Sequence, residues 1–217
     1  MKTILILLTL VLVLLGPLSW DAAGEVNLGV SIGDKGVKGF YLAVGDYFRV
    51  PEREVVVIKE RRIPDDEVAV VLFLSHHARV SPSVILNLRL SGRSWMDICF
   101  HYHLSPDIFY VPVGQEIKGP PYGNAYGYYN NKKKKNSERS ILKDADVVNL
   151  VNLKFISEHY GHSPEAVIKM RSEGRNFVAI NDEIKKGKKE KQREDKFVPP
   201  GGEGNGRGHG KGKGKWK

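Results

Sequence analysis

Cysteine is almost missing from this chain of 217 residues, in which Cys99 is the single thiol. One thiol forms no disulfide within its own chain, so the fold has to rest on an apolar core. We expect Cys99 to be a small core residue rather than a reactive thiol, because free cysteine is among the most buried residue types.

Hydrophobic runs long enough for a membrane helix are also missing, because such a span needs about 20 apolar residues and the longest run is Ile4–Leu15. Lys2 precedes this run, and a glycine-proline pair and the small residues Ala22–Gly24 follow it. This layout is typical of a secretory signal peptide. We predict that residues 1–24 are a signal peptide and that the protein is exported, to the periplasm or the extracellular space. An uncleaved membrane anchor is the alternative.

Motifs of catalysis and cofactor binding are missing as well. The sequence contains no G-x-S-x-G elbow, no phosphate-binding loop and no H-E-x-x-H pair, so we predict neither an enzyme nor a cofactor. Its seven histidines are not spaced as four ligands of a zinc site, so we predict no metal site.

Positive charge is present but unevenly placed. Residues 185–217 hold twelve Lys/Arg against four Asp/Glu, a net charge of +8 out of +9 for the chain. A segment rich in Gly and Lys has little to bury, so we predict that residues 184–217 are a disordered basic tail. We expect this tail and a run of four lysines to bind anionic polymers or lipid head groups weakly, the run being Lys132, Lys133, Lys134 and Lys135. A merely solvated tail is the alternative.

An internal repeat organises the body of the chain. The segments 73–98 and 155–180 align without a gap, 82 positions apart, with nine identities in 26 residues. We therefore predict two tandem copies of one unit, helical repeat 1 over 63–113 and helical repeat 2 over 141–183, which stack to bury a shared core.

Capping signals divide each copy into three helices. The second helix opens with Ser81-Pro82 in one copy and Ser163-Pro164 in the other, and Gly92 or Gly174 stands where a left-handed C-cap is wanted. The first helix is expected over 66–78 in copy 1 and from residue 144 in copy 2. The third is expected to begin at residue 94 or 176.

The remaining segments are less regular. Residues 25–62 are predicted to be β-rich, with a small hairpin of strands 26–32 and 39–44. The stretch after Pro51 fits a helix start or a strand. Residues 114–140, rich in Gly, Pro, Tyr and Lys, are predicted to be a linker. The fold class expected is mainly α: two tandem three-helix units, an N-terminal β-hairpin and a disordered basic tail.

Four arginines of the repeat have no required structural role and are candidate binding residues: Arg89, Arg93, Arg171 and Arg175. The first two helices of copy 2 also match the helix-turn-helix pattern, in which residues 164–175 would be the recognition helix with Lys169 on it. A nucleic-acid-binding protein is therefore the alternative function. Because the protein is expected to be exported, DNA is a disfavoured partner in the cell. We expect instead a non-enzymatic scaffold or binding protein of the cell envelope. The sequence does not identify its envelope or extracellular partner.

A group of small exported bacterial proteins, to which no activity is assigned, resembles this sequence in three places. They are the stretch Val50–Glu54, the two S-P-x-x-V/I units and the Gly-Pro-Pro-Tyr-Gly segment at 119–123. The resemblance covers most of residues 45–183. It implies bacterial export and a body of two repeats, and it transfers no site residue.

Overall fold

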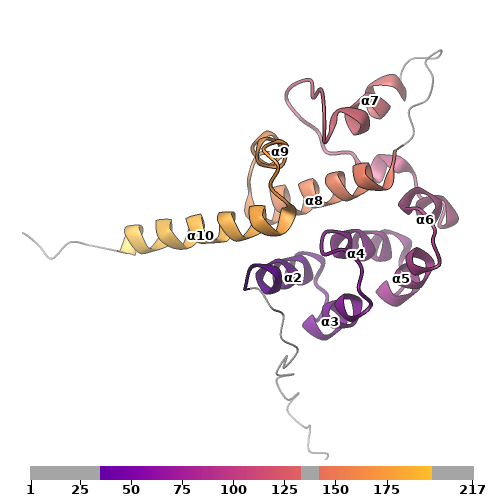
Figure 1. Cartoon of the computed structure of the whole chain (residues 1–217), viewed down its shortest axis with the longest axis horizontal. Helices are drawn as coiled ribbons and strands as arrows, with labels where there is room; N and C mark the ends of the chain where they lie inside the picture. Colours follow the sequence, from indigo (N-terminus) through magenta and orange to yellow (C-terminus); the bar gives the residue numbers. More distant parts are fainter. Residues whose placement is uncertain (1–34, 133–141, 197–217) are drawn as a thin grey trace, which may run out of the picture. The chain divides into compact units, whose positions relative to one another are not determined.

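A computed structural model describes residues 35–132 and 142–196, and it is helical throughout, without strands in these ranges (Figure 1). The chain divides after Gly33 into two units, and the described residues all fall in the second, Asp34–Lys217. The prediction of a mainly α-helical protein is confirmed. In chain order the elements are α2 (Lys35–Phe48), α3 (Glu52–Glu60), α4 (Glu67–Ala78), α5 (Pro82–Leu90), α6 (Trp95–His101), the 3-10 helix η1 (Pro106–Phe109), α7 (Gly123–Lys132), α8 (Asp144–Tyr160), α9 (Pro164–Ser172) and α10 (Phe177–Lys196).

The N-terminal part is helical, and the prediction of a strand over 39–44 is wrong. These residues lie inside α2, where Phe40, Tyr41, Ala43 and Val44 are buried. Their spacing of i, i+1, i+3 and i+4 is that of one helix face, which packs on α4, α8 and α10. The other expected strand, 26–32, lies outside the described residues.

The stretch after Pro51, which fitted either a helix start or a strand, forms helix α3. The described part of the segment 25–62 is therefore helical and not β-rich. Val55 and Ile58 point into the core from α3, which accounts for the β-branched cluster that resembles a strand in the sequence.

Two helices, α4 and α8, form the centre of the fold. Every residue from Glu67 to Ser75 on α4 is buried, and so is every residue from Asp146 to Leu153 on α8. The two helices pack on each other, and the other helices cover their remaining sides. A helix covered all round has no polar face, so its apolar residues show no one-sided stripe.

The expected helix ends lie where the capping residues stand. Helix α4 is followed by Arg79 and α8 by Gly161, both in the left-handed region with φ of 56° and 70°. Helices α5 and α9 begin with proline directly after serine, and Gly92 and Gly174 follow them with φ of 91° and 90°. The individual helices expected between residues 66 and 183 are confirmed.

Helix α10 extends beyond the boundary drawn from composition. It runs to Lys196, so the prediction of disorder is wrong for residues 184–196, while 197–217 lie outside the described residues. Lys and Glu are good helix formers, and Ile184 is still buried, which together continue a helix that the tertiary core has started. Asp182 and Lys186 add an i,i+4 ion pair.

The expected linker contains a helix. Residues 123–132 form α7, and the buried residues Tyr122, Ala125, Tyr126 and Tyr129 join the core there. Residues 133–141 lie outside the described residues. None of the helices described is long and apolar enough to cross a membrane.

Candidate functional site

Arg89, at the end of α5, is the most connected of the candidate arginines. Its Nε and Nη2 donate to the two carboxylate oxygens of Glu67 at 3.0 and 2.6 Å, and its Nη1 donates to Asp144 Oδ2 at 2.6 Å. Its guanidinium lies 4.6 Å from the ring centroid of Trp95. Hydrogen bonds to Glu67 hold the pKa of Arg89 above its usual value, against the opposite effect of burial. One side chain thus joins α4, α5, α6 and α8.

Arg171 occupies the equivalent position on α9, 82 residues later. Its Nη1 donates to the carbonyl of Arg175 at 3.1 Å, as Nη1 of Arg89 does to the carbonyl of Arg93 at 3.1 Å. Its guanidinium lies 5.1 Å from the ring centroid of Phe177. Its Nε donates to Oδ1 of Asn149, on α8, at 3.3 Å.

The other two arginines lie at the helix ends. Arg93 is exposed and contributes its carbonyl to Arg89. Arg175 donates to both carboxylate oxygens of Glu183 at 2.9 and 2.7 Å and to Glu173 at 2.9 Å. Arg89 and Arg171 therefore both contact α8, whereas Arg175 pairs with Glu173 and Glu183, which lie close to it in the sequence.

Of the lysine run, the described residues include Lys132. Lys132 is the last residue of α7, and Lys133, Lys134 and Lys135 lie outside the described residues. Affinity of this run for anionic polymers stays a prediction.

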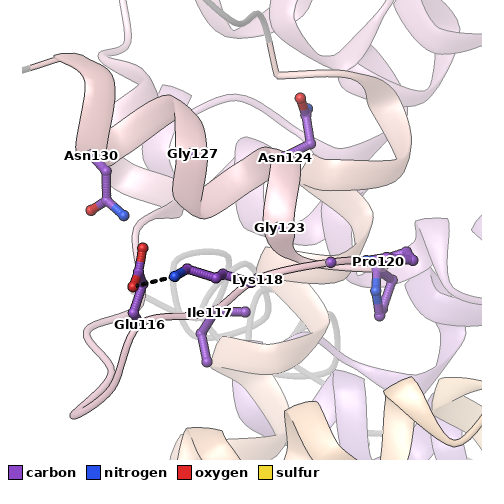
Figure 2. A pocket seen from close by; sticks show the side chains of 10 residues that line it. Glu116, Ile117, Lys118, Pro120, Gly123, Asn124, Gly127 and Asn130 are labelled. Carbon is purple, nitrogen blue, oxygen red and sulfur yellow. Dashed lines mark ion pairs between the residues drawn. The ribbon is translucent and has the colours of Figure 1, made fainter.

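A wide surface depression of about 640 Å³ lies between the loop at 116–121 and α7 (Figure 2). Its charged lining residues, Glu116 and Lys118, are exposed and pair with each other at 2.9 Å. Glycines, prolines, Ile117 and two asparagines make up the rest, so its walls carry no nucleophile and no histidine. This lining offers no evident catalytic chemistry.

Two histidines, His77 and His159, pack against phenylalanine rings, and no three metal-binding side chains come together in the described part of the chain. His77 lies with its ring centroid 4.1 Å from that of Phe73, one turn earlier on α4, and its Nδ1 lies 2.9 Å from the Phe73 carbonyl oxygen. The ring centroid of His159 likewise lies 5.6 Å from that of Phe155, one turn earlier on α8. Burial lowers the pKa of both histidines.

Three partners of the arginines were not expected from the sequence. Asp144 is the first residue of α8, and its Oδ1 accepts from the backbone N–H of Trp95 at 2.8 Å. Glu67 fitted a helix start in the sequence, and Asn149 stands at the same offset of 82 that relates the aligned segments. That substitution of an amide for a carboxylate was the available signal.

Comparison with protein-family models, with curated proteins and with solved structures gives no match. The resemblance to a group of small exported bacterial proteins therefore stays an expectation from the sequence.

Proposed function

We propose that this protein is a non-enzymatic helical binding protein of the bacterial cell envelope, in which two related three-helix units carry a basic extension that binds anionic polymers. The observation that carries the proposal is the lysine-rich part of α10 beyond Ile184. Export rests on the signal-peptide layout of residues 1–24, and a reporter active only outside the cytoplasm, fused after residue 30, tests it. A silent reporter would contradict the envelope location.

Matched geometry supports the proposal of two related units, one formed by α4, α5 and α6 and the other by α8, α9 and the start of α10. In each unit an arginine ends the second helix, stacks on the aromatic residue that begins the third helix and binds the carbonyl four residues later. Unrelated helices have no reason to share this detail together with the same serine-proline start and glycine end of the second helix at the same spacing.

The charge on α10 is concentrated past the last core residue. Residues 185–196 carry seven Lys/Arg against three Asp/Glu, a net charge of +4. Residues 186–190 are exposed, and Lys188 lies 5.1 Å from the ring centroid of Tyr160. Lys185, Lys188 and Lys189 share one side of the helix at i, i+3 and i+4. A row of lysines on a preformed helix favours a polyanion, because binding releases the counter-ions of the polymer.

The same geometry gives less support to the alternative, a helix-turn-helix that reads nucleic acid. Of the three basic residues on its recognition helix, Arg171 turns toward α8 and Arg175 pairs with two glutamates. Lys169 alone is exposed with no ion pair in the part of the chain that the structure describes. A recognition helix needs several side chains directed at base edges.

Binding of the full chain to a sulfated polysaccharide, measured over a series of salt concentrations, tests the polyanion proposal. The variant with Lys188→Gln and Lys189→Gln is expected to bind more weakly, with the slope of log K against log salt reduced by about 1–2. The matched control, with Arg53→Gln and Arg93→Gln, removes two exposed charges from the body and should keep the wild-type slope. An equal loss in both variants would contradict the assignment to α10, and tighter binding to duplex DNA would favour the alternative.

A further inference from the structure

Two arginines in equivalent positions have different electrostatic surroundings. Arg89 has two carboxylates, Glu67 and Asp144, within 2.6 Å of its guanidinium nitrogens. Arg171 makes no ion pair with any carboxylate that the structure describes, and Asn149 stands where the first unit has Glu67. The second arginine thus keeps the framework of the first and lacks its counter-charges.

Part of the Arg171 guanidinium remains available. Its Nη2 has no hydrogen-bond partner among the described residues, and the residue is partly exposed. Nη1 donates only to a backbone carbonyl, where Nη1 of Arg89 also binds a carboxylate. An arginine with five donor hydrogens therefore has unused capacity on one edge.

We propose that Arg171 binds the carboxylate group of an acidic ligand through Nη1 and Nη2. In the first unit the chain's own carboxylates occupy the same nitrogens of Arg89, which shows that the framework accepts this group. The planar guanidinium fork matches a carboxylate, and two parallel bonds add specificity. Phe177 beneath the guanidinium holds its plane in place.

The surroundings of Arg171 set limits on the ligand. Burial raises the pKa of Asp66, the residue before α4, and the nearby positive charge of Arg171 has a smaller, lowering effect. The two side chains make no ion pair. Tyr122 is buried beside Asn149, with its hydroxyl 3.4 Å from the Asn149 carbonyl oxygen. A neighbouring carboxylate opposes anions of higher charge more strongly, so the site favours a singly charged carboxylate over a phosphate. This site lies on the folded body and does not depend on the basic part of α10.

Nuclear magnetic resonance of the arginine Nε–H groups in the full chain tests the proposal, with sodium acetate as the probe and sodium chloride at equal ionic strength as reference. Acetate is expected to change the chemical shift of the Arg171 signal until the site is saturated. The Arg89 signal is expected to keep its chemical shift, because the guanidinium of Arg89 is already paired with carboxylates. Equal shifts of both signals, or a response that grows linearly without saturation, would overturn the proposal. A stronger response to inorganic phosphate would overturn the assignment to carboxylates.

The variant Asn149→Glu supplies the counter-charge that the first unit has. Its acetate affinity at Arg171 is expected to fall at least tenfold, because the new carboxylate takes the place of the ligand. A second variant, Arg171→Lys, keeps the charge and removes the fork, and it should lose the saturable response as well. Circular dichroism and the amide spectrum check that each variant is folded. Wild-type acetate affinity in a folded variant of either kind would contradict the site.

Discussion

The side chain of Arg89 connects its own helix, α5, to α4, α6 and α8. It pairs with Glu67 and Asp144 while it stacks on Trp95, and its side chain is 19% exposed. An ion pair of this kind does not by itself make a protein more stable than apolar packing would, but removal of one partner leaves the others uncompensated. Two carboxylates would then lie close together without a cation.

We predict that Arg89→Met lowers the free energy of unfolding by about 2–4 kcal/mol, somewhat less than for a fully buried pair. The expected loss is smaller than for a fully buried pair because the Asp144 side chain is 35% exposed, which lets water screen its charge. Urea denaturation monitored by circular dichroism measures the change. The matched control Arg93→Met, four residues further on and exposed, should stay within about 0.5 kcal/mol of the wild type. A similar loss in both variants would show that Arg89 acts only through general surface charge.

At the scale of the helices, the ends decide where each element stops. Helices α2, α3 and α4 are followed by Arg49, Arg62 and Arg79, all with positive φ between 56° and 58°. A left-handed conformation costs a side chain with a Cβ about 1–2 kcal/mol, whereas glycine adopts it freely. The end of α8 has glycine at the same place, Gly161, with φ of 70°.

The substitution Arg79→Gly is therefore expected to raise the free energy of unfolding by about 1 kcal/mol, because it removes this backbone strain from an exposed residue. The reciprocal change Gly161→Ala is expected to lower it by about 1 kcal/mol. A Cβ at Gly161 would meet no atom within 4 Å, so this loss reports backbone conformation alone. Thermal and urea unfolding measure both variants, and a destabilised Arg79→Gly would refute the explanation.

At the scale of the molecule, helices α4 and α8 pack on each other, and Asn152 of α8 donates from Nδ2 to the carbonyl of Asp66 at 2.8 Å.

His77 and His159 lie near the ends of these helices. His77 is near His76 and Lys154, whose charges lower its pKa, while its bond to the Phe73 carbonyl raises it. Around His159, Asp46 raises the pKa, and Lys185 and Lys188 lower it. Burial has the largest effect on both.

A pKa lowered by folding makes the unfolded chain bind more protons than the folded one below the unfolded value of about 6.5. This contribution to stability is therefore complete above pH 6.5 and decreases as the pH falls below it. We expect urea denaturation to give a smaller free energy of unfolding at pH 5.5 than at pH 7.5. The double variant His77→Gln, His159→Gln should show a smaller difference, and His101→Gln, a change at an exposed residue of α6, should keep the wild-type difference. An unchanged difference in the double variant would refute the role of these two histidines.

The parts of the fold predictable from the sequence are those that local chemistry controls. A serine followed by proline starts a helix and a glycine past its end stops it, so the bounds of α5 and α9 followed from residues within one turn. Cys99 is buried, as expected for a free cysteine. The strand expected over 39–44 failed because apolar residues at short spacing fit either period, and only the neighbours on α4, α8 and α10 select the helix.

By itself the sequence therefore determined the helical class, the helix ends of the repeated segments and the uneven distribution of charge, because each depends on residues close together in the chain. Only the tertiary structure decided the roles of the arginines. Glu67, Arg89 and Asp144 are separated by 22 and 55 residues, and their contact depends on how α4, α5 and α8 pack. Arg171 differs from Arg89 for the same reason, since the hydrogen bonds and ion pairs of a guanidinium depend on the groups that the fold brings to it.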